Sequence, residues 1–368
     1  SVAAFHHANA ERARRWPDAM LATATHDTKR GEDTRARLYA LSELPQEWER
    51  QVQAWSRIAR ARRGGTEGDA PPERNDEYLF YQLLLGAWPA ELTSVDRLEP
   101  ETMAVFAERI EGAMIKSVRE AKVSSSWAAP DEQYEEALKG FIRDCLDVSR
   151  SSAFLEIFLP FQARIARLGV LNSLAQLLLK LTVPGIPDVY QGSELWDLSL
   201  VDPDNRRPVD YDRRQALLEE LGSDLERNNA TMADLLENWQ DGRVKLALMW
   251  QVLTLRRARP ELFASGGYQP LETAGDRSDQ LCAFARDDTG DQIIVAVPRL
   301  VAALDAEPDW GNTSIVLPPG CANRHWENTL TGAVTEVDGR GDSTVIRAQS
   351  LFNNFPVALL ISVNESAP

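Results

Sequence analysis

Cysteine is scarce in this sequence. Its three cysteines, Cys145, Cys282 and Cys321, are widely spaced among 368 residues and odd in number. This pattern indicates no disulfide framework and provides no zinc ligand set, and it favours a reducing compartment. We therefore expect a cytoplasmic protein.

Long hydrophobic runs are also missing. The most apolar stretch, 170–183, is interrupted by Asn172, Ser173, Gln176 and Lys180. Because a transmembrane helix needs about 20 predominantly apolar residues, we expect no membrane span.

Positive charge is in deficit, with 40 Lys and Arg against 56 Asp and Glu and a formal net charge of −16. Such a surface repels a phosphate backbone, so we expect no nucleic-acid partner. The hydrophobic content of 43% is sufficient for a substantial core. At this length it predicts two domains, or one large domain and a small one.

Several cofactor and catalytic signatures are absent. The sequence contains no GxGxxG, GxxxxGK, HExxH, CxxC or GxSxG motif. These motifs mark common phosphate-cradling loops, metal sites and nucleophile elbows. We therefore expect neither a metal ion nor a cofactor.

The pattern of the first half predicts one short strand followed by helices. Residues 20–24 (MLATA) form a short apolar run before a polar loop, which is typical of a buried strand. Asp33 or Thr34 is the expected N-cap of the first helix. Apolar spacing predicts helices over 35–44, 45–63, 76–88, 100–121, 130–148 and 151–182, the last broken near Pro160 and Gly169, with a loop over 64–75.

The second half turns from helices to strands. A second short strand is expected at 186–190 and a Pro- and Asp-rich loop over 200–211, followed by helices over 212–221 and 242–259. From Tyr268 onward the pattern favours an antiparallel sandwich. We expect Trp310 and Trp326 in its core or on its surface, with stacking on sugar rings as the alternative. The expected strands are 280–286 and 292–298 as a hairpin, then 314–317, 333–337, 344–347 and 357–363.

Two polar clusters follow the predicted short strands. Residues 25–30 (THDTKR) combine an imidazole, a carboxylate and two cations directly after the first strand, and 202–210 (DPDNRRPVD) gathers carboxylates and guanidinium groups. Loops at the carboxyl ends of strands hold the sites of α/β enzymes, and such groups bind sugar hydroxyls. Judged alone, each cluster also fits a structural role, the first as a helix cap with solvated cations, the second as a salt-bridged loop.

The order of four longer motifs resembles the maltooligosyltrehalose synthase family, a branch of the α-amylase family of glycoside hydrolases. The motifs are LATATHDTKRGEDTRARL at 21–38, LLLGAWP at 83–89, KSVREAKVSSSW at 116–127 and PGIPDVYQGSELWDLSLVDPDNRRPVDY at 184–211. The resemblance covers nearly the whole chain. It implies intramolecular transglucosylation, in which the reducing-end α-1,4 linkage of a maltooligosaccharide becomes an α,α-1,1 linkage.

The resemblance implies an α/β fold. The chain would be the C-terminal part of a TIM-type (β/α)8 barrel, carrying strands 7 and 8, a large helical insertion and an antiparallel β-sandwich. The implied domains are 1–33 with strand 7 and the catalytic loop, 34–182 as the insertion, 183–262 with strand 8 and closing helices, and 263–368 as the sandwich.

The resemblance also assigns roles to residues. The aspartate matching Asp27 stabilises the transition state, the histidine matching His26 hydrogen-bonds the sugar at the cleavage subsite, and Lys29 and Arg30 lie beside the reducing-end glucose. We further expect substrate contacts from Arg119, Lys122 and Trp127, which would help to enclose that glucose, and from Tyr190, Gln191, Asp202, Asn205 and Arg206.

The sequence departs from the family in one respect. A full barrel takes about 250 residues, yet the presumed seventh strand begins near residue 20. Strands 1 to 6 and the family's nucleophilic aspartate and general-acid glutamate have no matching positions, so we expect the chain to be inactive alone. Another α-amylase-family hydrolase or 4-α-glucanotransferase, and a non-catalytic glucan-binding protein, remain alternatives. The pathway implies maltooligosyltrehalose trehalohydrolase as metabolic partner.

Overall fold

The computed structural model describes residues 1–61, 71–149, 152–226, 230–288, 291–306, 309–318, 325–340 and 343–363. It divides into two compact units. The first unit contains Ser1–Thr25, Val170–Trp196 and Val209–Pro368, and the second contains His26–Gly169 and Asp197–Pro208. Cys321 and most of the predicted loop 64–75 lie outside the described residues.

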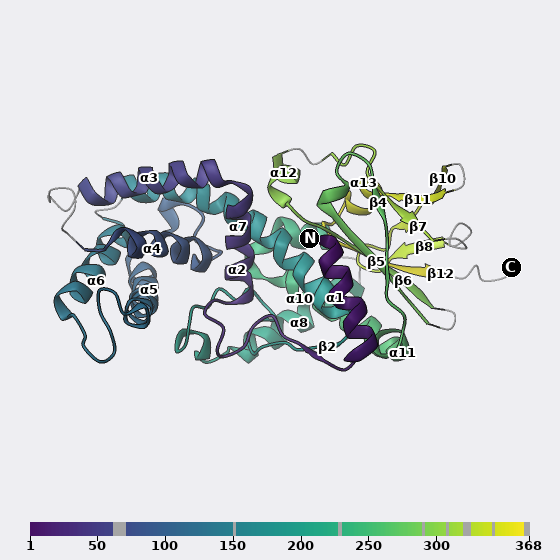
Figure 1. Cartoon of the computed structure of the whole chain (residues 1–368), viewed down its shortest axis with the longest axis horizontal. Helices are drawn as coiled ribbons and strands as arrows, with labels where there is room; N and C mark the ends of the chain where they lie inside the picture. Colours follow the sequence, from purple (N-terminus) through teal and green to yellow (C-terminus); the bar gives the residue numbers. More distant parts are fainter. Residues whose placement is uncertain are drawn as a thin grey trace. The chain divides into compact units, whose positions relative to one another are not determined.

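The second unit is helical (Figure 1). The predicted periodicity is confirmed for most of its helices, although α2 begins at Glu32 and not near Arg35. The predicted caps were wrong, because Gly31 is the N-cap and both Asp33 and Thr34 lie buried in the first turn. The helices are α2 (Glu32–Tyr39), η1 (Ala40–Glu43), α3 (Pro45–Ala61), α4 (Arg74–Ala87), η2 (Val95–Arg97), α5 (Pro100–Ala121), α6 (Glu132–Leu146) and η3 (Asp204–Arg206).

One long helix, α7 (Ser152–Thr182), contributes residues to both units. It continues through Pro160, so the predicted break was wrong. Proline removes one helical hydrogen bond, but here its neighbours Phe158 and Phe161 are buried. Their rings pack on Trp55, with centroids 5.3 and 5.8 Å away. This aromatic packing holds the helix together across the proline.

The first unit contains the two predicted short strands as a parallel pair, β1 (Met20–Leu21) and β2 (Ile186–Pro187). Both are shorter than expected. The first strand, predicted to be buried, has Met20 70% exposed, and in the second strand, for which burial was not predicted, Ile186 is 49% exposed. In the described part of the chain no third strand pairs with them. An apolar run therefore marks the position of each strand but not what covers it.

The other helices of the first unit lie before the sheets in the chain, except η5, α12 and α13, which lie between strands (Figure 1). An N-terminal helix, α1, was not predicted, because its sequence has a weak apolar stripe. The helices are α1 (Val2–Arg15), α8 (Tyr211–Glu226), α9 (Met232–Glu237), η4 (Trp239–Asp241), α10 (Arg243–Ala258), α11 (Pro260–Ala264), η5 (Ser278–Gln280), α12 (Val301–Ala306) and α13 (Ala348–Phe352). Among the described residues, no helix combines the length and apolar character needed to cross a bilayer.

Two antiparallel sheets end the first unit, with strand orders β10-β11-β7-β4 and β3-β5-β6-β12-β8-β9. The predicted hairpin is confirmed as β5 paired with β6. The strands are β3 (Gln269–Pro270), β4 (Thr273–Ala274), β5 (Leu281–Asp287), β6 (Gln292–Pro298), β7 (Ser314–Leu317), β8 (His325–Asn328), β9 (Val334–Thr335), β10 (Asp338–Arg340), β11 (Ser343–Arg347) and β12 (Ala358–Val363).

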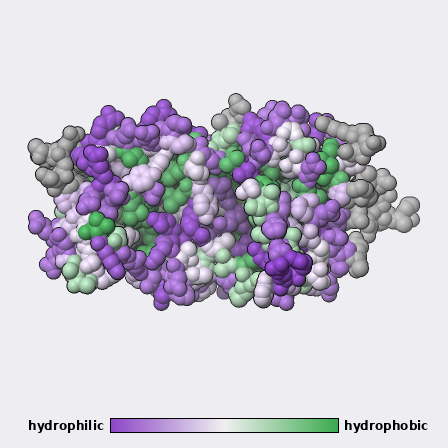
Figure 2. All heavy atoms as spheres, in the orientation of Figure 1, coloured by the Kyte–Doolittle hydropathy of each residue, from purple (hydrophilic) through white to green (hydrophobic). Residues whose placement is uncertain are grey.

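One hydrophobic cluster draws side chains from both sheets. Ile315 and Ile346 come from the four-stranded sheet, and Leu281 and Leu360 from the six-stranded sheet. Trp310 and Trp326 are 5% and 0% exposed and belong to the same cluster, so both lie in the core, one of the two placements that the sequence left open. Elsewhere, on the face shown in Figure 2, hydrophilic residues predominate and hydrophobic residues gather in small separate groups.

Candidate functional site

The loop that follows β1 presents two of the predicted site residues to solvent. The side chains of His26 and Asp27 are 58% and 85% exposed, and His26 Nε2 lies 3.4 Å from Asp27 Oδ2. Lys29 pairs with Glu120 of α5, with 3.1 Å between Nζ and Oε2. The second unit therefore displays an imidazole and a carboxylate together at the tip of one loop.

A second segment, Asp197–Pro208, holds this loop through the backbone, and we call it the strap. The Gly31 amide donates to the Ser199 carbonyl at 2.8 Å, and Arg30 forms an isolated antiparallel bridge with Leu200. The two motifs that the sequence marked as separate clusters are thus joined within the second unit.

Asn205 of the strap contacts the loop directly. Its Nδ2 donates to the His26 carbonyl at 2.9 Å and to the Thr28 carbonyl at 3.4 Å. These two carbonyls flank Asp27 in the chain, so one carboxamide fixes the backbone on both sides of the exposed carboxylate. The side chain predicted to bind sugar also orients the loop that carries Asp27.

Buried acids complete the junction. The Asp197 amide donates to Asp33 Oδ2 at 2.6 Å, and the Glu32 amide donates to Asp197 Oδ2 at 3.3 Å. Glu32 and Asp33 are only 2% and 3% exposed. The approach is so close that a Cβ on Gly31 would lie 2.4 Å from the Asp197 carbonyl oxygen. Glycine is therefore required there because a side chain would not fit. Its backbone conformation does not require glycine, since a φ of −54° is open to any residue.

Helix α5 anchors the other end of the strap. Arg109 donates to both carboxylate oxygens of Asp204, from Nε at 2.8 Å and from Nη2 at 3.1 Å. The Leu200 amide adds a hydrogen bond of 2.7 Å to the same carboxylate. Burial raises the pKa of Asp204, but the hydrogen bond and charge of Arg109 outweigh it, so the net pKa is lowered. Asp204 is therefore held as an ionised anchor.

The other predicted residues of the strap pair with neighbours. Arg206 Nε lies 2.8 Å from Asp202 Oδ1, and Lys116 Nζ donates to the Asp202 carbonyl at 2.8 Å. Asp202 and Arg206 keep 38% and 53% of their side-chain surface exposed. The salt-bridged loop that the sequence offered as a structural role for 202–210 is therefore present. The side chains of Asp202 and Arg206 nevertheless remain accessible to a ligand.

Arg119, Lys122 and Trp127 lie at the end of α5 and in the turn after it. Arg119 makes two hydrogen bonds to Glu135, of 2.7 and 2.6 Å, and its guanidinium lies 4.9 Å from the centre of the Trp127 ring. Lys122 caps α5 in a left-handed conformation. Trp127 is 58% exposed, so it is not a buried anchor. Arg119 is engaged by structural partners.

Tyr190 and Gln191 follow β2 in the first unit. The Tyr190 carbonyl accepts two hydrogen bonds from Ser193, from the amide at 2.9 Å and from Oγ at 2.6 Å, which form a tight turn. Gln191 is exposed at this turn. Both side chains are accessible within their own unit.

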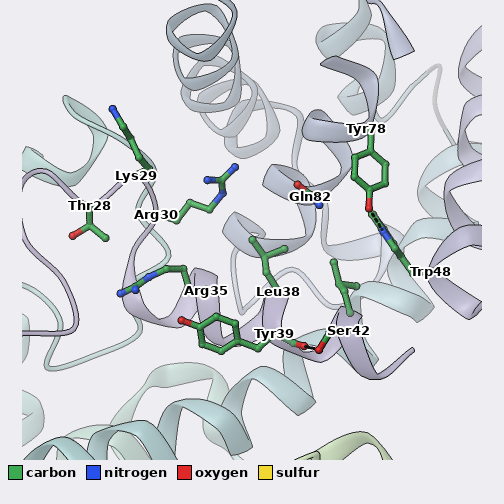
Figure 3. Close-up of a pocket in the computed structure, with 11 residues that line it drawn as sticks. Thr28, Lys29, Arg30, Arg35, Leu38, Tyr39, Ser42, Trp48, Tyr78 and Gln82 are labelled. Carbon is green, nitrogen blue, oxygen red and sulfur yellow. Dashed lines mark hydrogen bonds between the residues drawn. The ribbon is translucent and has the colours of Figure 1, made fainter. Parts of the chain in front are cut away.

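A cavity of about 500 Å³ lies beside the His26–Asp27 loop within the second unit (Figure 3). Two predicted site residues, Lys29 and Arg30, line it. In the described part of the chain, no group of three or more His, Cys, Asp or Glu side chains is arranged to hold a metal ion.

Sequence reasoning missed three residues of this arrangement. Arg109 and Asp197 carry no local signal, because their partners are distant in the chain. Gly31 carries a weak one, as a glycine between a polar loop and a helix. The roles of all three depend on close approach of the strap, which a pattern of residues does not report.

Comparison with protein-family profiles finds no match. Two proteins from strains CDC 1551 / Oshkosh and H37Rv of Mycobacterium tuberculosis, both named maltooligosyl trehalose synthase, are 36% identical to the chain over 364 residues. These residues cover 99% of this chain and 40% of each relative.

Solved structures give the same result. The maltooligosyltrehalose synthase of Arthrobacter ramosus is 35% identical with a TM-score of 0.77, covering 99% of this chain and 41% of that one. A second maltooligosyl trehalose synthase structure is 31% identical with a TM-score of 0.73 and covers 99% and 42%. The resemblance drawn from the motifs is therefore confirmed, and the chain spans about two-fifths of the length of the proteins that it matches.

Proposed function

We propose that this chain is the C-terminal portion of a maltooligosyltrehalose synthase and carries part of its active site. The supporting observation is the likeness to proteins of that name over 99% of the chain. The parallel pair β1 and β2 would be strands 7 and 8 of a (β/α)8 barrel, the helical second unit would be the insertion, and the two sheets a β-sandwich.

The proposed reaction is an isomerisation. The α-1,4 bond to the reducing-end glucose breaks, a glycosyl-enzyme forms, and the anomeric hydroxyl of the retained glucose attacks it to form the α,α-1,1 linkage. No water is consumed. A retaining mechanism of this kind needs a nucleophilic carboxylate and an acid about 5–5.5 Å apart. We propose that both lie in the part of the relatives that this chain does not span.

Within this chain Asp27 is the proposed transition-state residue. An ionised carboxylate can accept hydrogen bonds from sugar hydroxyls and offset positive charge that develops on the ring. Its 85% exposure leaves it accessible to a sugar, and the imidazole of His26 beside it can donate to a hydroxyl. Asn205 fixes the loop without occupying the carboxylate. Preorganisation of this kind avoids reorganisation when the transition state forms.

The surrounding residues have proposed supporting roles. Lys29 and Arg30 would lie beside the reducing-end glucose, and Tyr190, Gln191, Asp202 and Arg206 would contact the glucan. Three residues would help to exclude water, namely Arg119, Lys122 and Trp127. Exclusion is needed because water would otherwise hydrolyse the glycosyl-enzyme before the retained glucose attacks it. The pathway partner would be maltooligosyltrehalose trehalohydrolase, and the compartment the cytoplasm.

The test uses the full-length gene product with maltopentaose as substrate. A mutase lowers the number of reducing ends without shortening the glucan, and NMR identifies the α,α-1,1 linkage. Asp27→Asn should lower kcat by about 100- to 1,000-fold. Asp18→Asn, a change of the same kind at an exposed aspartate, should not.

Two outcomes would contradict the proposal. Shorter glucans that keep their reducing ends indicate a hydrolase or 4-α-glucanotransferase. Glucan binding without turnover by the full-length protein indicates a binding protein.

A further inference from the structure

The cavity beside the His26–Asp27 loop is lined by cations but by no carboxylate. Its residues come from the loop, from α2 with η1, from α3 and from α4 (Figure 3). The three charged members, Lys29, Arg30 and Arg35, are all basic. A chain with a net charge of −16 thus concentrates positive charge at one concave site, and such a site attracts anions.

Arg30 is the central cation of this cavity. Figure 3 shows its guanidinium in the middle of the ring of lining residues. Its Nε is fully buried and has no hydrogen-bond partner among the described residues. Burial also lowers the pKa of Arg30, because the charge is desolvated. Because solvent does not reach Nε, a ligand in the cavity would be bound by the other N–H donors of the Arg30 guanidinium.

Lys29 differs from Arg30 because it already shares its charge with Glu120 at 3.1 Å. Arg35, in the first half of α2, has a buried Nε like that of Arg30. Since Lys29 is neutralised in part, the guanidinium of Arg30 is the best-placed group for a bound anion. Guanidinium groups bind phosphate and carboxylate oxygens through paired, charge-assisted hydrogen bonds.

The rest of the cavity has the character of a site for an organic ring. Leu38 and Leu41 provide apolar surface, and the Trp48 indole donates from Nε1 to Tyr78 Oη at 2.7 Å, which fixes an aromatic wall. The volume of about 500 Å³ lies within the range of about 300–1,000 Å³ found for small-molecule sites. It exceeds what an inorganic anion alone would fill.

We propose that this cavity binds a small phosphate monoester with a ring, such as a phosphorylated sugar, with the phosphate on Arg30 and the ring against Trp48 and Leu38. The site overlaps the reducing-end contacts proposed above, because Lys29 and Arg30 belong to both. A ligand there would contact the loop next to Asp27. The phosphate is favoured over a carboxylate because it offers more acceptor oxygens to the cations at the rim.

The test is calorimetric titration of the chain with glucose 6-phosphate, with inorganic phosphate and with glucose. We expect glucose 6-phosphate to bind and phosphate to compete with it, while glucose does not. Arg30→Gln should weaken binding by about 10- to 100-fold, because a charge-assisted hydrogen bond is lost. Gln82→Glu, which places a carboxylate in the cavity, should weaken binding at least as much without altering the proposed glucan contacts.

The matched control is Arg57→Gln, which removes an exposed arginine of α3 that does not line the cavity and should leave binding unchanged. Equal weakening in this control would show that only the general charge matters and would overturn the proposal. So would the absence of glucose 6-phosphate binding by a folded chain. Displacement of glucose 6-phosphate by glucose would show a neutral sugar site, which overturns the anion site but leaves the proposed mutase function standing. Conversely, if the full-length protein proves not to be a mutase, the expected binding of glucose 6-phosphate does not change.

Discussion

Asn205 shows how one carboxamide can determine the position of the loop that carries Asp27. Its two hydrogen bonds reach the carbonyls of His26 and Thr28, on either side of Asp27. We predict that Asn205→Ala lowers the free energy of unfolding by only about 1 kcal/mol, since each such bond contributes about 0.5–1.5 kcal/mol. Amide hydrogen exchange in the loop should rise much more.

Asn354→Ala, at an exposed position of the first unit, is the control for that prediction. It should leave exchange in the loop unchanged. If the loop in Asn205→Ala is as protected from amide hydrogen exchange as in the unchanged chain, backbone hydrogen bonds alone hold the strap to the loop, which contradicts the prediction.

Glu135 carries the clearest pH signal in the second unit. The hydrogen bond from Arg119 lowers its pKa to about 2, against the opposing effect of burial and with help from Ser125. The unfolded chain takes up a proton near the ordinary value of 4.5, above the folded pKa. The stabilisation is therefore complete above about pH 4.5 and is lost as the pH falls towards 2.

We predict that Glu135→Gln lowers the free energy of unfolding at neutral pH by about 1–3 kcal/mol, because Arg119 and Ser125 lose an ionised partner. The variant should also lose part of the acid dependence. Glu136→Gln is the control, since Glu136 pairs with Lys139 on the helix surface, where such pairs contribute little to stability. Urea midpoints measured at neutral and acidic pH check both, and equal losses in the two variants would contradict the assignment.

At the scale of elements, the junction of α2 with the strap depends on one glycine. We predict that Gly31→Ala destabilises the fold by about 1–3 kcal/mol, since the new Cβ would meet the Asp197 carbonyl at 2.4 Å and backbone must move. Gly112→Ala, in α5 with no neighbour within 4 Å, should instead stabilise by about 0.5–1 kcal/mol. Thermal unfolding distinguishes the two, and a stable Gly31→Ala variant would show that the strap can shift.

The elements also show which features the sequence could predict. Helices such as α5, Pro100–Ala121, were found at their observed bounds because an amphipathic period is written in local spacing. The break expected in α7 was wrong because packing of Phe158 on Trp55 outweighs the preference of Pro160. The short strands were placed but not their exposure, since burial of a strand depends on neighbours elsewhere in the chain.

The candidate site was predicted in the same uneven way. His26 and Asp27 were found because polar residues after a strand are a local signal. The role of Asn205 was not, because a hydrogen bond across 179 residues leaves no trace in the spacing of its neighbours.

At the scale of the whole molecule, the chain spans about two-fifths of the proteins that it matches. If the nucleophile and the acid lie in the remainder, this chain alone should give no α,α-1,1 product from maltopentaose. We expect the full-length gene product to form it. Product NMR on both checks the prediction, and turnover by the isolated chain would mean that its own carboxylates suffice.

The division of the second unit between two stretches of sequence also has a consequence for synthesis. The carbonyls of His26 and Thr28 leave the ribosome long before Asn205, which follows His26 by 179 residues. At about 5–20 residues per second, the loop that carries Asp27 spends roughly 10 to 35 s without its partner. That loop is therefore among the last parts of the nascent second unit to take its final form, although it is among the first to be made.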